Sequence, residues 1–542
     1  MNLYHSIHPK MAAPTEIDTD QISTTNRNRV RVWRGAALTG DRLVLALVVL
    51  FLFCDLVVIL RAAASNPLWM DEVLAVWVAR LPSAAAIYSA LAHGAEFSPP
   101  TYHLLLHYLS AVAGDSYLVY RLLSVFAHIV TGICLFTLLR RYLDISSAAF
   151  GVTFALLGFL PFFALQARPY ALLVACFALA TLLWDDLDRT GISFWRVAGI
   201  ALLLAFTGSL HFYAALFVVC LGSMELVWSM LHARVRPAVW IALIVSGLCS
   251  LAWLPLLRTL SRFNAGDTWG SSYYARPKIS ALGFVYMKLF LFSGQHVLFL
   301  LSTIVLLGAA YALSGSRGLK ASSFRVAAGP TEKSRTNLYV IAFCEVVFPL
   351  CIFIVARLVT KTFNDRYCLI GCLGFSILAA CVVSHLSTIR IIGPFMVLIA
   401  CSMTLMDIPS FGERADYLQP MLARTDRSLP VVIGEGLQFL QLEESAPPAT
   451  RSRFVYVTAP AGVVSPDPTN ENQVKRWIPI RPDLPITDAA TFFARYPRFY
   501  ILHTGISTDV MTDWLASKGL LDRVVARQGG AWLFEARSPN PE

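Results

Sequence analysis

The sequence is poor in charge: only 14% of its 542 residues are Asp, Glu, Lys or Arg, whereas 56% are hydrophobic. Its mean hydropathy is +0.61. A soluble domain usually carries about 25% charged residues. This shortage argues against an ordinary water-soluble protein. It indicates an integral membrane protein with enough length left for a soluble domain.

Negative charge is scarcest in the apolar part of the chain. The formal net charge is +10, yet Ile408 to Glu542 holds 14 Lys and Arg against 15 Asp and Glu, a balance of −1. The remaining +11 belongs to residues 1–407, where short basic loops act as topology signals. No basic stripe or nucleic-acid-binding signature is present, so nucleic acid is not an expected partner.

Cysteine is missing from the C-terminal part, since all 11 cysteines lie between Cys54 and Cys401. Internal disulfides are therefore excluded there. Cys368 and Cys372 are four residues apart, and we interpret them as small buried side chains rather than metal ligands. The sequence also lacks an internal repeat and a Gly-rich phosphate loop. About 40 polar residues precede the first apolar run, which is unlike a cleavable signal peptide.

What the sequence has in abundance is long apolar runs. A spanning helix needs about 20 mostly apolar residues. We predict about eleven such helices, near 43–60, 117–139, 148–165, 169–184, 194–211, 212–230, 238–257, 296–313, 338–357, 367–386 and 391–407. The positive-inside rule places the arginine-rich N-terminus in the cytoplasm. An odd number of spans then places the C-terminal part outside.

The predicted organisation has three parts: a disordered basic cytoplasmic N-terminus at 1–42, a transmembrane domain at 43–407 and an extracytoplasmic domain at 408–542. The first external loop, 61–116, contains the short apolar stretch PPTYHLLLHYLSAV, which predicts a re-entrant or interfacial helix. The stretch SALGFVYMKLFLFSG in the loop 258–295 is expected to lie along the membrane surface.

The C-terminal part alternates strand-like and helix-like segments. LPVVIG, RFVYVT, RFYILHTG and DRVVARQGGAWLFEAR predict strands, whereas EGLQFLQL and TDVMTDWLASKG predict helices. We therefore expect a small α/β domain.

The predicted topology gathers polar side chains on the external face. Arginine suits phosphate there because its planar fork binds two oxygens at once. Carboxylates suit a hydroxyl that must lose a proton. The candidate residues of this chamber are Asp71, Glu72, Glu96, Arg121, Arg168, Tyr170, His211, Tyr213, Lys361, Asp365, Arg366 and Tyr367.

The order of several short motifs resembles the GT-C membrane glycosyltransferases. The resemblance is closest to the dolichyl-phosphate-mannose–protein mannosyltransferases and their bacterial relatives, including the aminoarabinose transferases that act on lipid A. It spans roughly residues 40–410 and rests on the order of DE after the first span, SPPTYHLLLHYL, YRLLSV, QARPYALL, HFYAALF and DRYCLI. Each motif alone is short and common.

This resemblance implies a GT-C-like fold and transfer of a sugar from a polyprenyl-phosphate carrier to an external acceptor. Asp71 matches the general base, and Glu72 would support it or hold the acceptor. The expected donor phosphate or sugar contacts are Glu96, Arg121, Arg168, Tyr170, His211, Tyr213, Lys361, Arg366 and Tyr367. Here EFSPP stands where many relatives carry His or Lys before the proline, so one cationic contact to the phosphate is missing or supplied elsewhere.

Plainer interpretations stand beside these. Asp71 and Glu72 could cap a helix, His211 could be a structural histidine, and the tyrosines could form an interfacial belt. Arg366 could pair with Asp365 or with the C-terminal tail. Asp55, inside the first span, has no assigned role.

Other functions and partners also stay open. A transporter or flippase of lipid-linked intermediates is the chief alternative, and a structural partner in an envelope complex is another. Mg²⁺ or Mn²⁺ would suit the carboxylates, although no ligand cluster of diagnostic spacing is present. The expected partners are membrane lipids, the lipid-linked donor and a lipid, glycan or protein acceptor. The expected location is the bacterial cytoplasmic membrane.

Overall fold

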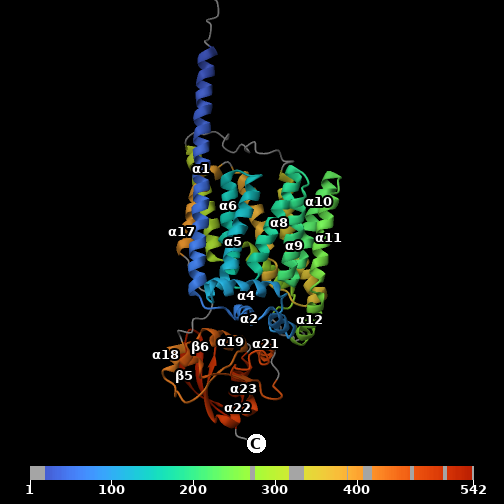
Figure 1. The fold of residues 1–542 in the computed structure, drawn as a ribbon. Helices are drawn as coiled ribbons and strands as arrows, with labels where there is room; N and C mark the ends of the chain where they lie inside the picture. Colours follow the sequence, from blue (N-terminus) through green and yellow to red (C-terminus); the bar gives the residue numbers. More distant parts are fainter. Residues whose placement is uncertain are drawn as a thin grey trace, which may run out of the picture.

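The computed structural model describes residues 19–268, 275–316, 335–386, 388–406, 418–463, 469–504 and 509–539. Figure 1 shows a bundle of helices with a smaller domain, built around a β-sheet, at one of its ends. The chain is thus a helical polytopic membrane protein with a C-terminal α/β domain, as the sequence predicts. We call the end of the bundle beside that domain the domain-facing end.

Long helices form the bundle (Figure 1): α1 (Thr19–Ser65), α5 (Tyr117–Arg140), α8 (Tyr170–Thr190), α9 (Phe194–Leu210), α10 (Leu216–His232), α11 (Pro237–Leu251), α14 (Gly294–Ser316), α15 (Thr336–Val355), α16 (Ile370–Ser384) and α17 (Ile389–Met406). Among the described residues, six helical segments are long and apolar enough to cross a membrane, or up to eight if each of two bent pairs is one span. Every predicted span coincides with a helix or a bent pair of helices. The number eleven itself stays a prediction.

The N-terminal helix is longer than expected. We predicted disorder over 1–42, but α1 already begins at Thr19. Once a helix is nucleated, each further residue adds a hydrogen bond, so the apolar segment Gly40–Ser65 can propagate a helix towards the N-terminus. Residues 1–18 of the predicted segment lie outside the described residues, as do residues 317–334 between two predicted spans.

One predicted span is broken. The segment 148–165 forms α6 (Ile145–Leu156) and the short α7 (Leu160–Ala164), separated at Gly158. A Cβ atom at Gly158 would lie 3.0 Å from Cε1 of His296, so the close approach of α14 favours glycine at the break. Two further helix pairs are bent: α11 with α12 (Leu254–Thr268) by 48°, and α13 (Ile279–Phe290) with α14 by 57°.

Short helices cross the domain-facing end of the bundle. They are α2 (Met70–Ala79), α3 (Ala84–Ala92) and α4 (Thr101–Ala113), and Figure 1 shows α4 lying across the long helices. Pro100 precedes α4, and Gly114, with φ of 92°, follows it. With 13 residues, α4 is too short to span a bilayer, as the sequence predicts. The predicted surface stretch forms α13, which packs against α15 and α16.

The C-terminal domain contains a six-stranded sheet in the order β3-β2-β1-β4-β6-β5. The strands β1 (Val431–Ile433), β2 (Phe454–Thr458), β3 (Ile486–Asp488) and β4 (Arg498–His503) are parallel, whereas β6 (Ala531–Arg537) is antiparallel to both β4 and β5 (Leu521–Gln528). Gly529 and Gly530 form the β5–β6 turn with φ of 58° and 86°, values that glycine adopts without strain. All four predicted strand segments are confirmed, whereas the short β3 has no counterpart among them.

Helices cover the sheet: α18 (Leu418–Leu422), α19 (Gly436–Ser445), α20 (Pro448–Arg451), α21 (Thr469–Trp477), α22 (Ala489–Arg495) and α23 (Val510–Ser517). The two predicted helices correspond to α19 and α23. Figure 1 shows α19 and α21 on the side of the domain that faces the bundle.

The two units meet through α2. Arg80 pairs with Glu444 of α19 at 2.9 Å, and Trp77 donates to the same carboxylate at 2.8 Å. The rings of Trp77 and Trp477 meet edge to face at 5.3 Å. The soluble domain therefore packs on the helix that begins with the candidate carboxylates.

Ion pairs inside the bundle account for several polar residues of the apolar segments. Asp55, which had no assigned role, is 3% exposed and pairs with His128 of α5 at 2.8 Å. At the end opposite the soluble domain, Asp185 pairs with Arg141, and Arg236 forks onto Glu225. Buried charges of this kind are stable only when paired.

Candidate active site

The carboxylate of Asp71 stands at the first turn of α2. It is partly exposed and forms an ion pair with Nη1 of Arg366, while Nη2 of Arg168 lies 4.0 Å away. Burial opposes ionisation of Asp71, but Arg366 and Arg168 outweigh it and lower the pKa of the carboxyl. Asp71 is therefore a carboxylate at neutral pH, with one side open to an incoming group.

The next residue, Glu72, has a different environment. Its side chain is 1% exposed and accepts four hydrogen bonds: from the backbone amides of Trp69 and Ala167, and twice from Arg121 at 2.7 and 2.8 Å. The amide of Trp69 lies just before α2, so this carboxylate also caps the helix. Glu72 holds the start of α2 in place and presents no oxygen to open space.

Arg121 completes that buried clamp. Its side chain is 0% exposed, and its five N–H donors go to Glu72 and to the carbonyls of Ala63, Asn66 and Pro67. A guanidinium has five donors, so none remains for a phosphate. The structure places Arg121 behind the candidate site rather than in it.

Arg168 connects three elements at the site. Its Nη1 donates to the backbone carbonyl of Asp71 at 3.0 Å and to Glu96, and its Nη2 donates to the Tyr170 hydroxyl at 3.3 Å. His103 of α4 lies behind, with Nε2 3.1 Å from the second oxygen of Glu96. These contacts fix the guanidinium between α2 and α8.

Arg366 comes from the short 3-10 turn η5 (Asp365–Tyr367), where the Asn364 side chain accepts from its backbone amide. Its guanidinium lies 5.7 Å from the ring centroid of Tyr170 and 5.8 Å from that of Tyr367. Cation–π contacts of this kind hold a guanidinium over aromatic faces.

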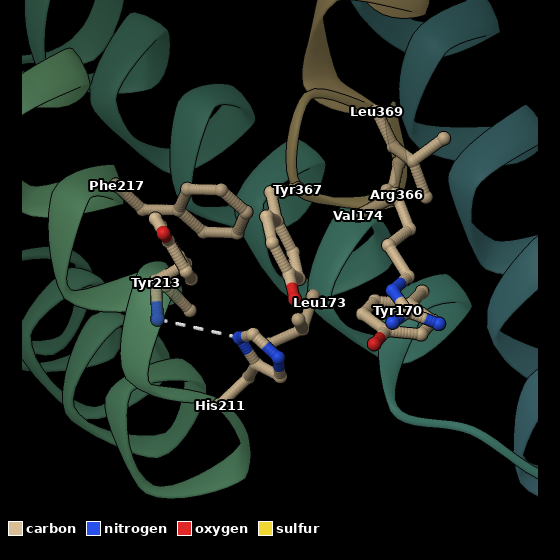
Figure 2. A pocket seen from close by; sticks show the side chains of 10 residues that line it. Tyr170, Leu173, Val174, His211, Tyr213, Phe217, Arg366, Tyr367 and Leu369 are labelled. Carbon is tan, nitrogen blue, oxygen red and sulfur yellow. Dashed lines mark hydrogen bonds between the residues drawn. The ribbon is translucent and has the colours of Figure 1, made fainter. Parts of the chain in front are cut away.

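A pocket opens beside Arg366 (Figure 2). It encloses about 270 Å³, part of it open to solvent. Figure 2 shows the rings of Tyr170, Tyr213 and Tyr367 lining it together with His211. The rings of Tyr213 and Tyr367 stack at 4.2 Å, and His211 lies 5.2 Å from Tyr367. The remaining lining residues are Leu173, Val174, Ala214, Phe217 and Leu369.

Contacts on either side of the pocket fix two of its side chains. The Tyr213 hydroxyl donates to the carbonyl of Thr362 at 2.6 Å, and Nδ1 of His211 accepts from the backbone amide of Tyr213 at 3.2 Å. His211 ends α9 and caps the 3-10 turn η1 (Phe212–Ala215). Burial, with Arg168 and Arg366 nearby, lowers the pKa of His211 to about 3.

The structure brings most predicted site residues together: Asp71, Glu96, Arg168, Tyr170, His211, Tyr213, Arg366 and Tyr367 lie around one corner of the domain-facing end. Lys361 does not join them. Its side chain is exposed and its amino group donates to the carbonyls of Arg357 and Leu358. Asp365, the alternative partner predicted for Arg366, pairs with Lys288 of α13 at 2.6 Å.

Two residues near the site, His103 and Lys288, were not predicted from the sequence. His103 belongs to the quoted SPPTYH motif, so its place one turn into α4 was a usable signal. Lys288 belongs to a stretch that we read as a surface helix, and no local signal connected it with Asp365. Its amino group pairs with Asp365, the residue that precedes Arg366 in the sequence.

The described side chains do not fit a metal ion well. Within the described ranges, no group of three or more His, Cys, Asp or Glu residues is arranged to hold one. Asp71 and Glu96, the two carboxylates of the site, are each held by an arginine. A cation would have to displace guanidinium groups, so we derive no step through a metal.

Comparison with known proteins gives a likeness of fold. No protein-family model and no curated protein matches the chain. ArnT from Cupriavidus metallidurans bound to undecaprenyl phosphate has a TM-score of 0.48 and 11% identity over 90% of this chain and 97% of that chain. The apo state of the same ArnT has a TM-score of 0.43 and 14% identity, with the same coverage of both chains. The Archaeoglobus fulgidus oligosaccharyltransferase with zinc and sulfate gives 0.39 and 11% over 75% of this chain and 62% of that chain.

Proposed function

We propose that the chain is a membrane glycosyltransferase that moves a sugar from a polyprenyl-phosphate carrier to a hydroxyl or similar group of an acceptor. The observation that carries the proposal is the partly exposed Asp71 carboxylate, flanked by Arg366 and Arg168 beside an aromatic pocket. A base, two anion-binding groups and a ring-lined pocket are the parts that such a transfer needs. The order of motifs in the sequence supports the same reaction.

In the proposed reaction, the acceptor oxygen attacks the anomeric carbon from the side opposite the phosphate. A bond forms between that oxygen and the carbon as the bond from the carbon to the phosphate oxygen breaks. Asp71 takes the acceptor proton, and the lipid phosphate leaves as an anion. Attack from the opposite side inverts the anomeric centre and needs no covalent enzyme intermediate. Arg366 and Arg168 stabilise the charge that develops on the phosphate.

The ion pair between Arg366 and Asp71 gives the phosphate a second role. A donor phosphate that attracts Arg366 weakens the pair and raises the pKa of Asp71 towards its ordinary value. A stronger base then faces the acceptor. Arg168 keeps its position during this exchange because Glu96 and the Asp71 carbonyl hold it.

The other predicted site residues take supporting roles in this proposal. Glu72 and Arg121 fix the start of α2, and so the position of Asp71. Glu96 orients Arg168. We place the active site and the soluble domain on the extracytoplasmic side of a bacterial cytoplasmic membrane, as the charge pattern of the sequence predicts. The acceptor is a lipid, a glycan or a protein.

The direct test incubates the purified full-length protein with a polyprenyl-phosphate sugar and an acceptor extract, and follows release of the lipid phosphate. Release coupled to glycosylation supports the enzyme. Donor binding without release in every acceptor preparation would instead favour a carrier of lipid-linked intermediates.

Arginine variants test the donor contact. Each of Arg168→Ala and Arg366→Ala should weaken donor binding by about 10- to 150-fold, since a hydrogen bond to a charged group contributes about 1.5–3 kcal/mol. Arg366→Lys should recover only part of the loss, because a point charge lacks the bidentate fork. Arg498→Ala, which removes an exposed partner of Glu535 in the soluble domain, is the matched control. Unchanged donor affinity in a correctly folded variant would remove that arginine from the site.

A further inference from the structure

His211 carries a donor of fixed direction. Its Nδ1 accepts a hydrogen bond from the Tyr213 amide, so the ring proton of the neutral imidazole sits on Nε2. The side chain is 6% exposed and lines the pocket. Figure 2 shows the ring lying between Tyr213 and the Tyr170–Arg366 side of the pocket. The Nε2–H group is therefore a donor set by the backbone.

Two further polar groups at the pocket, on Arg366 and Tyr170, are also donors. Arg366 has donors and no acceptor. The Tyr170 oxygen accepts from Arg168 at 3.3 Å, which leaves its hydroxyl proton to donate. The Tyr213 hydroxyl proton goes to the Thr362 carbonyl. A sugar hydroxyl can accept from such groups, whereas an ammonium has three donors and no acceptor.

The charges around the pocket also disfavour a positively charged sugar. Among the ten described residues that line it, the charged one is Arg366 and none has a carboxylate. Three carboxylates near the pocket are already paired with cations: Asp71 with Arg366, Glu96 with Arg168 and Asp365 with Lys288. Burial and these two arginines also oppose a proton on His211. An ammonium beside His211 would meet the same burial and the same two positive groups.

Building on the proposed function, we infer that this pocket selects a donor sugar without a positive charge, whose hydroxyl accepts the Nε2–H of His211, and that it rejects a sugar with a free ammonium. Apolar C–H faces of the ring would pack on Tyr170, Tyr213 and Tyr367, as in other pockets lined by aromatic side chains with a few oriented polar groups. His211 would thus determine sugar specificity.

The test compares three polyprenyl-phosphate donors that differ at one ring position: a hydroxyl, a free amino group and the N-formylated amino group. Binding is measured by competition with a fluorescent polyprenyl phosphate, and turnover by release of lipid phosphate. The hydroxyl and N-formyl donors should bind at least about tenfold better than the amino donor at pH 7, equivalent to about 1.4 kcal/mol. Raising the pH above the pKa of the sugar amine should narrow that gap.

Variants connect the selection to His211. His211→Leu should weaken the hydroxyl donor about tenfold, the effect of losing one hydrogen bond. His211→Gln, which keeps an N–H group at a similar place, should recover most of it. Both variants should bind polyprenyl phosphate without a sugar as the parent protein does. His503→Gln, at a partly exposed histidine of the soluble domain, is the matched control and should leave the preference unchanged.

Failure of this inference and failure of the proposed function give different results. Equal or tighter binding of the amino donor, or a loss of sugar-free lipid phosphate binding in His211→Leu, overturns the inference even if lipid phosphate is released. Preferential binding of the uncharged donors without release under any condition leaves the selective pocket standing and contradicts the glycosyltransferase.

Discussion

Adjacent residues at the start of α2 have opposite environments. Asp71 is partly exposed and pairs with arginines of a site, whereas Glu72 is buried and saturated by hydrogen bonds. The proposed function therefore separates chemistry at Asp71 from support at Glu72. A substitution at Asp71 should lower turnover, whereas a substitution at Glu72 should lower stability.

Asp71→Asn keeps the shape of the side chain but removes the base. Turnover should fall by about 10²- to 10⁴-fold, the usual contribution of general-base catalysis. The protein should still insert and bind donor, which competition with a fluorescent polyprenyl phosphate measures. Asn caps a helix about as well as Asp. Near-normal turnover in Asp71→Asn would show that Asp71 is not the base.

Glu72→Gln should instead damage folding. Loss of one partner leaves the charge of Arg121 buried and uncompensated, which typically costs about 3–5 kcal/mol. Thermal unfolding of the purified protein in detergent should show a large fall in Tm, with turnover lost in proportion to folded protein. Glu535→Gln, whose arginine partners are exposed, is the control with little expected effect. An unchanged Tm with lost turnover would return Glu72 to the reacting groups.

The residues of the site were predictable in part. Asp71, Arg168 and Arg366 follow from the order of short motifs along the chain, and they meet at one corner. The partner of Glu72 was not predictable, because it depends on how α5 rotates Arg121 towards the carbonyls before α2. Packing between helices decides where a side chain on a buried helix face points. The spacing of residues along the sequence does not reveal that packing.

At the scale of elements, the soluble domain contacts the loop that carries Glu96. Gln473 of α21 is buried and donates to the carbonyl of Ala95 at 2.5 Å. Arg476, one turn later, lies over Phe97 at 5.0 Å. Glu96 lies between these two contacts and in turn holds Arg168. The domain thus positions a side chain of the site from outside.

Gln473→Met keeps the size of the side chain and removes its donor. We expect turnover to fall several-fold, since a lost hydrogen bond costs about 0.5–1.5 kcal/mol and Glu96 becomes less fixed. Gln473→Lys, which restores an N–H donor, should recover part of the rate. Steady-state kinetics and the Tm of each variant are measured together. A change in Tm with an unaltered rate per folded molecule would make the contact purely structural.

The elements themselves were largely predictable, but their docking was not. Short runs of β-branched and aromatic residues indicate the strands β1, β2 and β4 locally. The contact of Trp77 with Trp477 joins residues far apart in the sequence, and neither segment alone indicates it.

At the scale of the whole molecule, ion pairs at the end opposite the soluble domain account for the segment DDLDR at 185–189, which is not net basic as the positive-inside rule expects of a cytoplasmic loop. Asp185 and Asp186 pair with Arg141, and Asp188 accepts from Trp228 and Asn337. These carboxylates are partners for other helices, which accounts for their presence at this end of the bundle.

Reporter fusions test the orientation. A reporter after residue 145 should be cytoplasmic, and reporters after residues 90 and 460 should be external, because the basic loops stay inside. Activity of an alkaline phosphatase and fluorescence of a cytoplasmic reporter give opposite readings at each site. An external reading at 145 would invert the whole arrangement and move the proposed site to the cytoplasmic face.

The ion pair of Arg366 with Asp71 also bears on the order of events in time. While that pair is intact, the carboxylate is a weak base and a water molecule near it is poorly activated. In the proposed reaction a bound donor phosphate competes for the arginine, so the acceptor gains by arriving second. Initial-rate measurements should therefore reveal compulsory-order kinetics with the donor first. Wasteful hydrolysis of the lipid-linked sugar should stay slow when no acceptor is present.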